Sequence, residues 1–140
     1  SKYIQVQVRT DPVAIVGDPG KLRIIVDNLL SNAIKYSLPG GRVKVSLVRN
    51  GDNVVMDVQD GGPGVVSEEK EKIFEAFFQG QARARSHVKG SGLGLFIVRE
   101  FTRLHRGTIE VVDEPVGAHF RVTLPGAVSE EQPEQLAVQV

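Results

Sequence analysis

The chain has 140 residues, which is enough for one domain with a single hydrophobic core and too few for a second domain of ordinary size. Its 17 basic and 17 acidic residues cancel, which argues against a general nucleic-acid or polyanion binder, and the absence of cysteine excludes disulfides and thiolate zinc sites. The apolar runs, such as residues 13–16, are far too short to cross a membrane, and residues 1–10 do not have the pattern of a signal peptide.

The first part of the chain predicts a strand followed by a long helix. Residues 3–8 alternate polar with apolar side chains, which is typical of a strand. Asp18 and Pro19 have the properties of an N-cap and a first helical residue. Apolar residues then recur at helical spacing to about residue 37, which predicts the longer of two helices.

The middle of the chain predicts a hairpin and a less regular segment. Residues 43–47 and 54–58 alternate on either side of Asn50-Gly51, which predicts a hairpin that turns at these two residues. A short helical piece is expected at 67–74. Residues 79–90 have no period and are expected to form a loop.

The last part predicts a second helix and two further strands. The helix is expected from about 91 to 105 and is expected to be capped by Gly107. Strands are expected at 108–112 and 119–124, and the acidic tail, residues 126–140, is expected to be disordered. Strands before, between and after two helices predict an α+β fold, with one mixed sheet and the helices on one face.

Four polar or amphipathic side chains share one edge of the first predicted helix. Asn28, Asn32, Lys35 and Tyr36 fall in a sector about 100° wide and extend over about 12 Å. One interpretation is a solvated edge with an i, i+4 amide pair. The other is the wall of a ligand site, with amide oxygens for a hard cation, an ammonium for phosphate and a ring for a flat base. The spacing alone leaves both interpretations open.

An acidic residue falls on the core side of the second hairpin strand. Counting by two along residues 54–60 puts Asp60 on the same face as three apolar side chains. An inward carboxylate needs a hydrogen-bond donor, because burying it unpaired is costly. Asp60 either begins the turn and bonds its own backbone, or lies on a pocket floor and accepts from the exocyclic amine of a ligand. In the second interpretation, Gly62 and Gly64 leave room for the ring system of that ligand.

A glycine-rich segment, residues 90–95, opens the second predicted helix. Backbone N–H groups at a helix start form a phosphate site, and glycine lets phosphates come close. The pattern is not a P-loop, because the Lys-Ser/Thr pair is missing, and it does not follow a strand as a dinucleotide fingerprint does. Residues 76–98 contain no acid but include Arg83, Arg85 and Lys89, which suits a lid over a polyphosphate. A flexible hinge is the alternative interpretation.

Four motifs together resemble the catalytic ATP-binding domain of sensor histidine kinases, in the GHKL (Bergerat-fold) superfamily. Residues 28–36 (NLLSNAIKY) resemble the N box, and residues 60–64 (DGGPG) resemble the first glycine box. Residues 73–80 (IFEAFFQG) resemble the F box, and residues 90–95 (GSGLGL) resemble the second glycine box. The order and spacing of the motifs agree with this family, and the resemblance covers about residues 1–125.

The resemblance implies a two-layer α/β sandwich with a mixed, mostly antiparallel sheet. It implies that ATP binds between the helices and the loop that joins the two glycine boxes. Asn32 is expected to ligate a Mg²⁺ ion that bridges the phosphates, with Asn28 in support. Lys35 is expected to meet phosphate, Tyr36 to flank the adenine, and Asp60 to accept a hydrogen bond from the adenine amino group.

Further nucleotide contacts are implied for the glycine boxes and the F box. The residues expected to bind the nucleotide are Asn28, Asn32, Lys35, Tyr36, Asp60, Gly62, Gly64, Phe77, Lys89, Gly90, Ser91, Gly92, Leu93, Gly94 and Leu95. The second glycine box is expected to act through its backbone N–H groups. Phe74, Phe77 and Phe78 are expected to anchor the lid, with plain core packing as the alternative for these three rings.

One position of the N box bears on the mechanism. In the ATP-hydrolysing relatives of this superfamily, a Glu one turn before the metal-binding Asn activates the attacking water. This chain has Asn28 there, and an amide cannot act as a general base. The resemblance therefore implies slow hydrolysis, with catalysis by positioning and charge neutralisation that involve Asn28, Asn32 and Lys35.

The phosphoacceptor histidine of the family lies on a separate helical hairpin, and none of His87, His105 and His119 is expected to replace it. The implied function is ATP-dependent phosphorylation of that histidine on the dimerisation helices, followed by relay to an Asp of a response-regulator receiver domain. The alternatives are a nucleotide-binding module without phosphotransfer and a serine kinase of the anti-sigma-factor type. Because Ser1 is not a natural start, we expect a fragment of a longer protein. This domain is expected in the cytoplasm, without membrane or nucleic-acid contact of its own, and the parent protein in the inner membrane.

Overall fold

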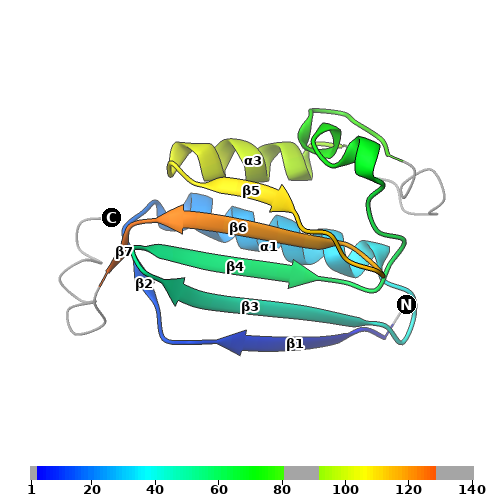
Figure 1. The fold of residues 1–140 in the computed structure, drawn as a ribbon, viewed down its shortest axis with the longest axis horizontal. Coiled ribbons are helices and arrows are strands. Elements are labelled where there is room, and N and C mark those ends of the chain that lie inside the picture. The colour runs from blue at the N-terminus through cyan, green and yellow to red at the C-terminus, as the bar shows by residue number, and fades with distance from the viewer. Residues whose placement is uncertain (1–2, 81–91, 129–140) are drawn as a thin grey trace.

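The computed structural model of the chain describes residues 3–80 and 92–128. These residues form two α-helices, two short 3₁₀ helices and two β-sheets (Figure 1). The elements in chain order are β1 (Gln5–Thr10), β2 (Ala14–Ile15), α1 (Pro19–Tyr36), β3 (Arg42–Asn50), β4 (Asn53–Gln59), η1 (Ser67–Glu69), η2 (Lys72–Phe74), α3 (Gly94–Leu104), β5 (Thr108–Val111), β6 (His119–Pro125) and β7 (Ala127–Val128). Within the described ranges, no helix has the length and apolar character that a membrane span requires.

The main sheet has five strands in the order β1-β3-β4-β6-β5. Strand β1 runs parallel to β3, and the other neighbouring pairs are antiparallel. Both α-helices lie on the same side of this sheet, α1 behind its central strands and α3 next to β5 (Figure 1). The predicted α+β sandwich, with a mixed, mostly antiparallel sheet and helices on one face, is confirmed.

The hydrophobic core fills the space between the helices and the sheet. Alternate residues of β4 and β6, such as Val58 and Val122, face the helices because strand side chains alternate between the two faces. Ile25 and Leu29 of α1 and Val98 of α3 pack against them and are almost completely buried. The core therefore holds α1 and α3 against the sheet in the positions from which they reach the site described below.

Helix α1 begins where its capping signal predicts. Asp18 accepts a hydrogen bond from the backbone N–H of Lys21 at 3.0 Å, and Pro19 lies in the first turn. The backbone and side-chain hydrogen bonds from Lys21 lower the pKa of Asp18. The backbone N–H of Asp18 in turn donates to Nε2 of His105 at 3.0 Å. His105 therefore has a structural role, because it joins the end of α3 to the start of α1.

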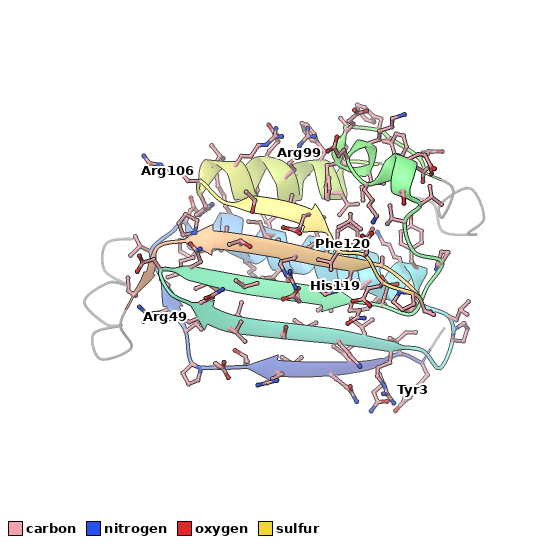
Figure 2. All side chains as sticks on the ribbon, in the orientation of Figure 1. Tyr3, Arg49, Arg99, Arg106, His119 and Phe120 are labelled. Atoms are coloured by element: carbon pink, nitrogen blue, oxygen red, sulfur yellow. The ribbon has the colours of Figure 1, made fainter. Side chains whose placement is uncertain are left out.

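The C-terminal end of α3 differs from the prediction that Gly107 caps it. The residue with a left-handed backbone is Arg106, with φ of 61° (Figure 2). The N–H groups of Arg106 and Gly107 donate to the carbonyls of Arg103 and Thr102, each at 2.9 Å, as in a Schellman motif. Gly107 is required for a different reason: a Cβ there would lie 2.4 Å from the carbonyl oxygen of Thr123 in β6.

The hairpin between β3 and β4 is confirmed, with a turn shifted by one position. Asn50 pairs with Asn53, so the turn residues are Gly51 and Asp52 rather than Asn50 and Gly51. Gly51 has φ of 61°, which a two-residue hairpin turn requires at its first position.

The sequence pattern does not predict the second sheet, which consists of β2 and β7. These strands are antiparallel, with Ala14 opposite Val128 and Ile15 opposite Ala127. Strand β7 belongs to the segment for which the composition predicts disorder, so ordered structure continues past residue 125. The rest of that segment, residues 129–140, lies outside the described residues.

We expect Gly107→Ala to destabilise the domain by about 1–3 kcal/mol, because the added methyl group must displace the β6 backbone or the end of α3. Equilibrium unfolding in denaturant, followed by circular dichroism, measures the change. Gly61→Ala is the matched control, because a Cβ at Gly61 meets no atom within 4 Å, and it should change stability by less than about 0.5 kcal/mol. Equal effects of the two substitutions would contradict the packing role of Gly107.

Candidate nucleotide-binding site

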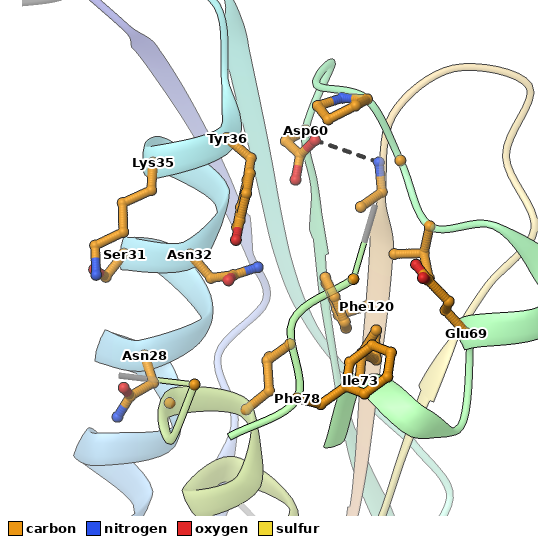
Figure 3. A pocket seen from close by; sticks show the side chains of 18 residues that line it. Asn28, Ser31, Asn32, Lys35, Tyr36, Asp60, Glu69, Ile73, Phe78 and Phe120 are labelled. Carbon is orange, nitrogen blue, oxygen red and sulfur yellow. Dashed lines mark hydrogen bonds between the residues drawn. The ribbon is translucent and has the colours of Figure 1, made fainter. Parts of the chain in front are cut away.

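A pocket lies between α1 and the start of α3, over the ends of β4 and β6 (Figure 3). The space between protein atoms here is about 1050 Å³, a figure that includes the opening of the pocket to solvent. Residues of all four motifs line it. The predicted nucleotide contacts among the lining residues are Asn28, Asn32, Lys35, Tyr36, Asp60, Gly64, Gly92, Gly94 and Leu95.

One wall of the pocket is the polar edge of α1, which consists of Asn28, Asn32, Lys35 and Tyr36 (Figure 3). Nδ2 of Asn28 donates to the carbonyl oxygen of Ile24 at 2.9 Å. The amide of Asn28 is therefore used in its own helical turn, and not in an i, i+4 pair with Asn32. All four residues of this edge line the pocket, as the ligand-wall interpretation predicts.

The floor of the pocket carries the inward carboxylate of Asp60, which is only 5% exposed. Its Oδ1 accepts hydrogen bonds from the backbone N–H groups of Gly62 at 2.8 Å and Ala118 at 3.3 Å. Its second oxygen points into the pocket (Figure 3). The structure therefore combines the two interpretations, because Asp60 bonds its own turn with one oxygen and presents the other to a ligand.

The surroundings of Asp60 make its free oxygen a good acceptor. Burial raises the pKa of Asp60, while the hydrogen bonds from Gly62 and Ala118 act in the opposite direction. An ionised oxygen that is largely removed from water bonds strongly to an N–H donor that enters the pocket. The exocyclic amine of a purine is a donor of this kind.

The glycines after Asp60 have different roles. A Cβ on Gly62 would lie 2.4 Å from the carbonyl oxygen of Tyr36, so Gly62 lets the turn pack against the end of α1. Gly62 is not among the residues that line the pocket, and its contact with a ligand stays a prediction. Gly64 lines the pocket; its φ is 78°, and a Cβ there would lie 2.8 Å from the carbonyl oxygen of Gly117.

The start of α3 forms the other end of the pocket. The helix begins at Gly94 rather than near residue 91, and no side chain of the described residues caps its N-terminus. A Cβ on Gly94 would lie 3.1 Å from Oδ1 of Asn28, so glycine brings this helix start close to the polar edge of α1. Leu93 does not line the pocket, although Leu95 does. The other predicted contacts here, and the bases of the predicted lid, lie outside the described residues: Arg83, Arg85, Lys89, Gly90 and Ser91.

The F box supports the pocket through Phe74 and Phe78. Phe74 is buried and packs edge to face against Phe120, with ring centroids 6.1 Å apart. Phe78 lines the pocket, whereas Phe77 is 70% exposed and does not, so the structure does not bring Phe77 to the predicted nucleotide site. The backbone N–H of Phe77 instead donates to the carbonyl of Gly92 at 2.9 Å, which joins the F box to the second glycine box.

Several lining residues were not among the predicted contacts. They are Ser31, Pro63, Val65, Glu69, Ile73, Gly80, Ala118 and Phe120. Ser31 lies one turn from Asn28, so a wider sector of the predicted helix would have included it. Ala118 and Phe120 reach the pocket because β6 pairs with β4, with Phe120 opposite Val58. Pairing between strands so far apart in sequence leaves no local signal.

Comparison with known proteins agrees with this geometry. The family of histidine kinase-, DNA gyrase B-, and HSP90-like ATPases matches residues 17–128. The chain belongs to this family.

The similar proteins are sensor histidine kinases. The chain is 41% identical over 139 residues to the sensor-like histidine kinase SenX3 of Mycobacterium tuberculosis (strain H37Rv). This alignment covers 93% of the chain and 34% of SenX3. The chain thus spans about a third of the length of this relative.

Solved structures of histidine kinases share the fold. The mycobacterial sensor histidine kinase MprB matches with a TM-score of 0.78 and 35% identity, over 88% of this chain and 82% of that one. Full-length ShkA, in complex with AMPPNP, matches with a TM-score of 0.77 and 32% identity, over 90% of this chain and 26% of that one. The fold is that of the ATP-binding domains of histidine kinases, and the chain is an ATP-binding domain of this type.

We expect Asp60→Asn to raise the free energy of unfolding at neutral pH, because the folded state no longer has to bury an ionised carboxylate. The amide oxygen can still accept from Gly62 and Ala118. The pKa of Asp60 is higher in the folded state than its ordinary value of 3.8. Asp60 therefore contributes most to the stability of the wild type below pH 3.8, and this contribution is lost as the pH rises through the folded-state pKa. The stability difference between variant and wild type should therefore grow with pH over this window and then level.

Denaturant unfolding from about pH 3 to about pH 7 measures this difference. Asp11→Asn, at an exposed acid, is the matched control and should show no comparable growth. A wild type that gains stability relative to Asp60→Asn as pH rises would contradict the assignment.

Proposed function

We propose that this chain transfers the γ-phosphoryl group of Mg-ATP to a histidine on the dimerisation helices of a sensor histidine kinase, of which it is the catalytic domain. The observation that carries the proposal is the presence in one pocket of the Asp60 carboxylate, the polar edge of α1 and the start of α3. Family membership and the similarity to SenX3 support the proposal.

In this proposal the base lies at the end of the pocket formed by β4, and the phosphates lie at the end formed by α3. Asp60 accepts a hydrogen bond from the adenine amino group through its pocket-facing oxygen, and Tyr36 flanks the ring. Lys35 and the N–H groups at the start of α3 balance the charge of the phosphates. The AMPPNP complex of ShkA supports a triphosphate ligand in a domain of this fold.

The oxygen donors of the pocket fit a magnesium ion that enters with the nucleotide. Mg²⁺ prefers oxygen ligands, and with phosphates it needs only one or two protein groups. The described ranges contain no cluster of three or more His, Cys, Asp or Glu residues that could hold a metal by itself. Asn32, supported by Asn28, supplies the amide oxygen in this proposal. When bound, the ion neutralises charge on the transferred phosphoryl group.

The residue at position 28 favours transfer over hydrolysis. An amide cannot remove a proton from water, and Nδ2 of Asn28 is already bonded to the Ile24 carbonyl. Asn32 and Lys35 position and neutralise the phosphates without activating a water molecule. The γ-phosphoryl group is therefore retained until an acceptor binds.

The acceptor is supplied by another part of the parent protein. His105 and His119 both bond protein groups through both ring nitrogens, and His87 lies outside the described residues. A receiver domain of a response regulator then takes the phosphoryl group on an Asp. The proposed setting is the cytoplasm, where ATP is abundant, with the parent kinase anchored in the inner membrane.

Phosphotransfer in trans tests the proposed function. The chain is mixed with the dimerisation helices of its parent protein and with Mg-ATP labelled at the γ position. We expect an acid-labile phosphohistidine on the helices and little free phosphate without them, since the amide at position 28 cannot act as a general base. Helices with the acceptor histidine replaced by Gln are the control and should stay unlabelled. ATP binding without transfer would indicate a nucleotide-binding module, acid-stable phosphoserine on a partner would indicate a serine kinase, and either result would overturn the proposal.

We expect Asn32→Ala to weaken Mg-ATP binding by about tenfold or more, because it removes an oxygen ligand of the ion. Calorimetric titrations with and without Mg²⁺ measure the loss, which should fall on the Mg²⁺-dependent part of the affinity. Asp27→Ala is the matched control on the same helix, because Asp27 is exposed and pairs across one turn with Arg23. An unchanged Mg²⁺ dependence in Asn32→Ala would rule out the metal role.

A further inference from the structure

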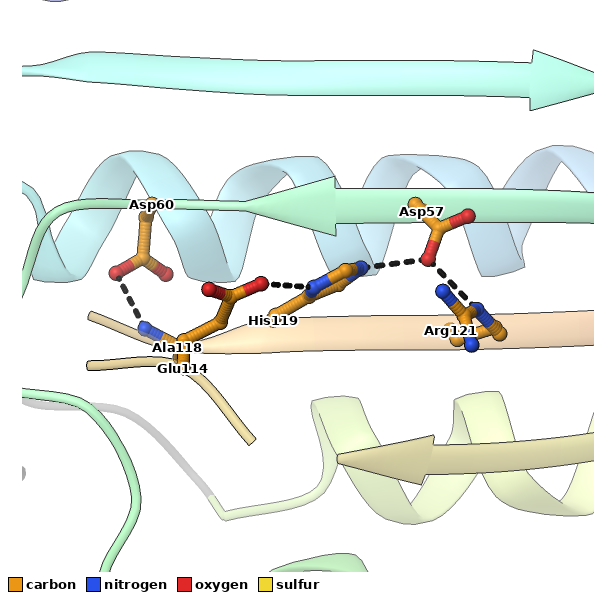
Figure 4. A network of polar contacts seen from close by, with 6 residues as sticks. All are labelled: Asp57, Asp60, Glu114, Ala118, His119 and Arg121. Atoms are coloured by element: carbon orange, nitrogen blue, oxygen red, sulfur yellow. Dashed lines mark hydrogen bonds and ion pairs between the residues drawn. The ribbon is translucent and has the colours of Figure 1, made fainter. Parts of the chain in front are cut away.

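The sheet face opposite the helices, which we refer to as the open face, has charged side chains in two different situations. On β4 and β6 they are engaged with one another (Figure 4). Oδ1 of Asp57 accepts from Nε of Arg121 at 2.9 Å and lies 2.5 Å from Nε2 of His119. Nδ1 of His119 lies 2.7 Å from Oε1 of Glu114. Each of these four side chains therefore has a partner on the open face.

The basic side chains of β1 and β3 are in the second situation. Val43 is buried on the helix side of the sheet, so Arg42 and Lys44 beside it belong to the open face. Arg9 belongs to the same face, because it pairs with Ser46, two residues after Lys44. All three basic residues are exposed. We refer to Arg9, Arg42 and Lys44 as the basic strip.

The described residues provide no acid that balances the basic strip. The sequences of β1 and β3 contain basic residues and no acid. Asp11 and Asp52 follow these strands along the chain, but none of the ion pairs between described residues involves the strip. The strip therefore presents its positive charges to solvent.

Two residues of the basic strip line a groove that crosses β1, β3, β4 and β6. Arg9 and Lys44 lie in this groove together with Gln7 and Ser46. Gln7 is paired with Lys44 and Arg9 with Ser46, and neighbouring strands are about 5 Å apart. The groove thus brings two cations close to an amide and a hydroxyl that can also donate hydrogen bonds. A carboxylate is complementary to such a group, because it is negative and only accepts.

Suitable carboxylates occur in the chain itself, just after β7. Residues 129–134 include Glu130, Glu131 and Glu134 and contain no base. This segment lies outside the described residues, so only its sequence and its point of attachment are considered. Its charge is opposite to that of the basic strip.

The point of attachment allows the segment to reach the strip. Nη1 of Arg49, in β3, donates to the carbonyl oxygen of Val128 at 3.0 Å, so the segment starts beside the end of β3. Lys44 is five residues back along this strand, which corresponds to about 17 Å. Glu134 is six residues beyond Val128, and an extended chain of this length spans about 20 Å. The glutamates can therefore lie over the strip without any change in the described fold.

We propose that residues 129–134 fold back over the open face and that their three glutamates contact the basic strip. Contacts between exposed charges are weak individually and do not require regular structure in the segment. The proposal therefore agrees with the acidic composition that predicts a disordered tail. The contact is independent of the proposed function, because the basic strip and the nucleotide pocket lie on opposite faces of the sheet.

A paramagnetic label in the segment tests the proposal. Because the chain has no cysteine, a nitroxide can be attached at the single substitution Gln132→Cys, between the glutamates. At about 10 mM salt charges interact over about 30 Å, and at about 1 M salt over about 3 Å. We expect the label to broaden the backbone amide signals of the basic strip at low salt and to release them at high salt. The loss of intensity is measured against the sample with the nitroxide reduced.

Variants of the strip show whether its charge holds the segment. Arg9→Gln combined with Lys44→Gln should recover most of the intensity lost over β1 and β3 at low salt. Arg23→Gln combined with Lys72→Gln is the matched control, because it removes two exposed basic residues of α1 and η2, and it should leave the broadening unchanged. The signal of Arg49 should be broadened in every labelled sample, because the segment starts beside it.

Three results would overturn the proposal. The first is broadening at low salt that is confined to the surroundings of Arg49. The second is broadening of the basic strip that persists at about 1 M salt or in the double variant of Arg9 and Lys44, since the contact would then not depend on charge. The third is equal broadening in a mixture of labelled chains with isotope-enriched, unlabelled chains, which would assign the contact to the tail of a second copy. All samples are free of nucleotide, so none of these results bears on the proposed function.

Discussion

The structure depends on one buried carboxylate and the backbone groups that hold it. Asp60 is removed from water at the end of β4, and a carboxylate in such a place is tolerated only where donors compensate for the lost hydration. The donors are the N–H groups of Gly62 and Ala118, so the turn after β4 and the start of β6 converge on a single oxygen. Because Gly62 also packs against the Tyr36 carbonyl, the end of α1 is fixed by the same arrangement. The second oxygen is left to the pocket.

The length of α1 sets the distance between the Asp60 end of the pocket and the end formed by α3. Tyr36 lies beside the Asp60 end and Asn28 lies beside the start of α3, and eight residues of helix span about 12 Å. A purine triphosphate has its base and its phosphates separated by a distance of this order. Gly94 allows a close approach at the far end, since a Cβ there would lie 3.1 Å from Oδ1 of Asn28 and this side chain would have to shift. The polar edge of α1 therefore lines the pocket and also sets the distance between its two ends.

The parts of the fold with local causes could be predicted from the sequence, and the parts with nonlocal causes could not. The Asp18 cap, the period of α1 and the inward face of Asp60 each depend on residues within one turn or one strand, and all are confirmed. Arg106 takes the left-handed position, whereas Gly107 is needed against Thr123, a contact with a distant strand. The short β2–β7 sheet likewise depends on pairing between the two ends of the domain. The four motifs contain most of the residues that line the pocket. Whether a glycine packs against the fold or lines the pocket depends on neighbours that are far away in sequence.

The two faces of the sheet hold their acids in different ways, and this difference explains why the β5–β6 loop matters. On the helix face, Asp60 is held by backbone donors, which carry no charge and do not titrate, so its geometry is independent of pH except through its own proton. On the open face, Asp57 and Glu114 are held by the side chains of Arg121 and His119. The β5–β6 loop is bonded at Glu114 to the open face and at Ala118 to the helix face. It is therefore the element that connects the two faces of the sheet at the Asp60 end of the pocket.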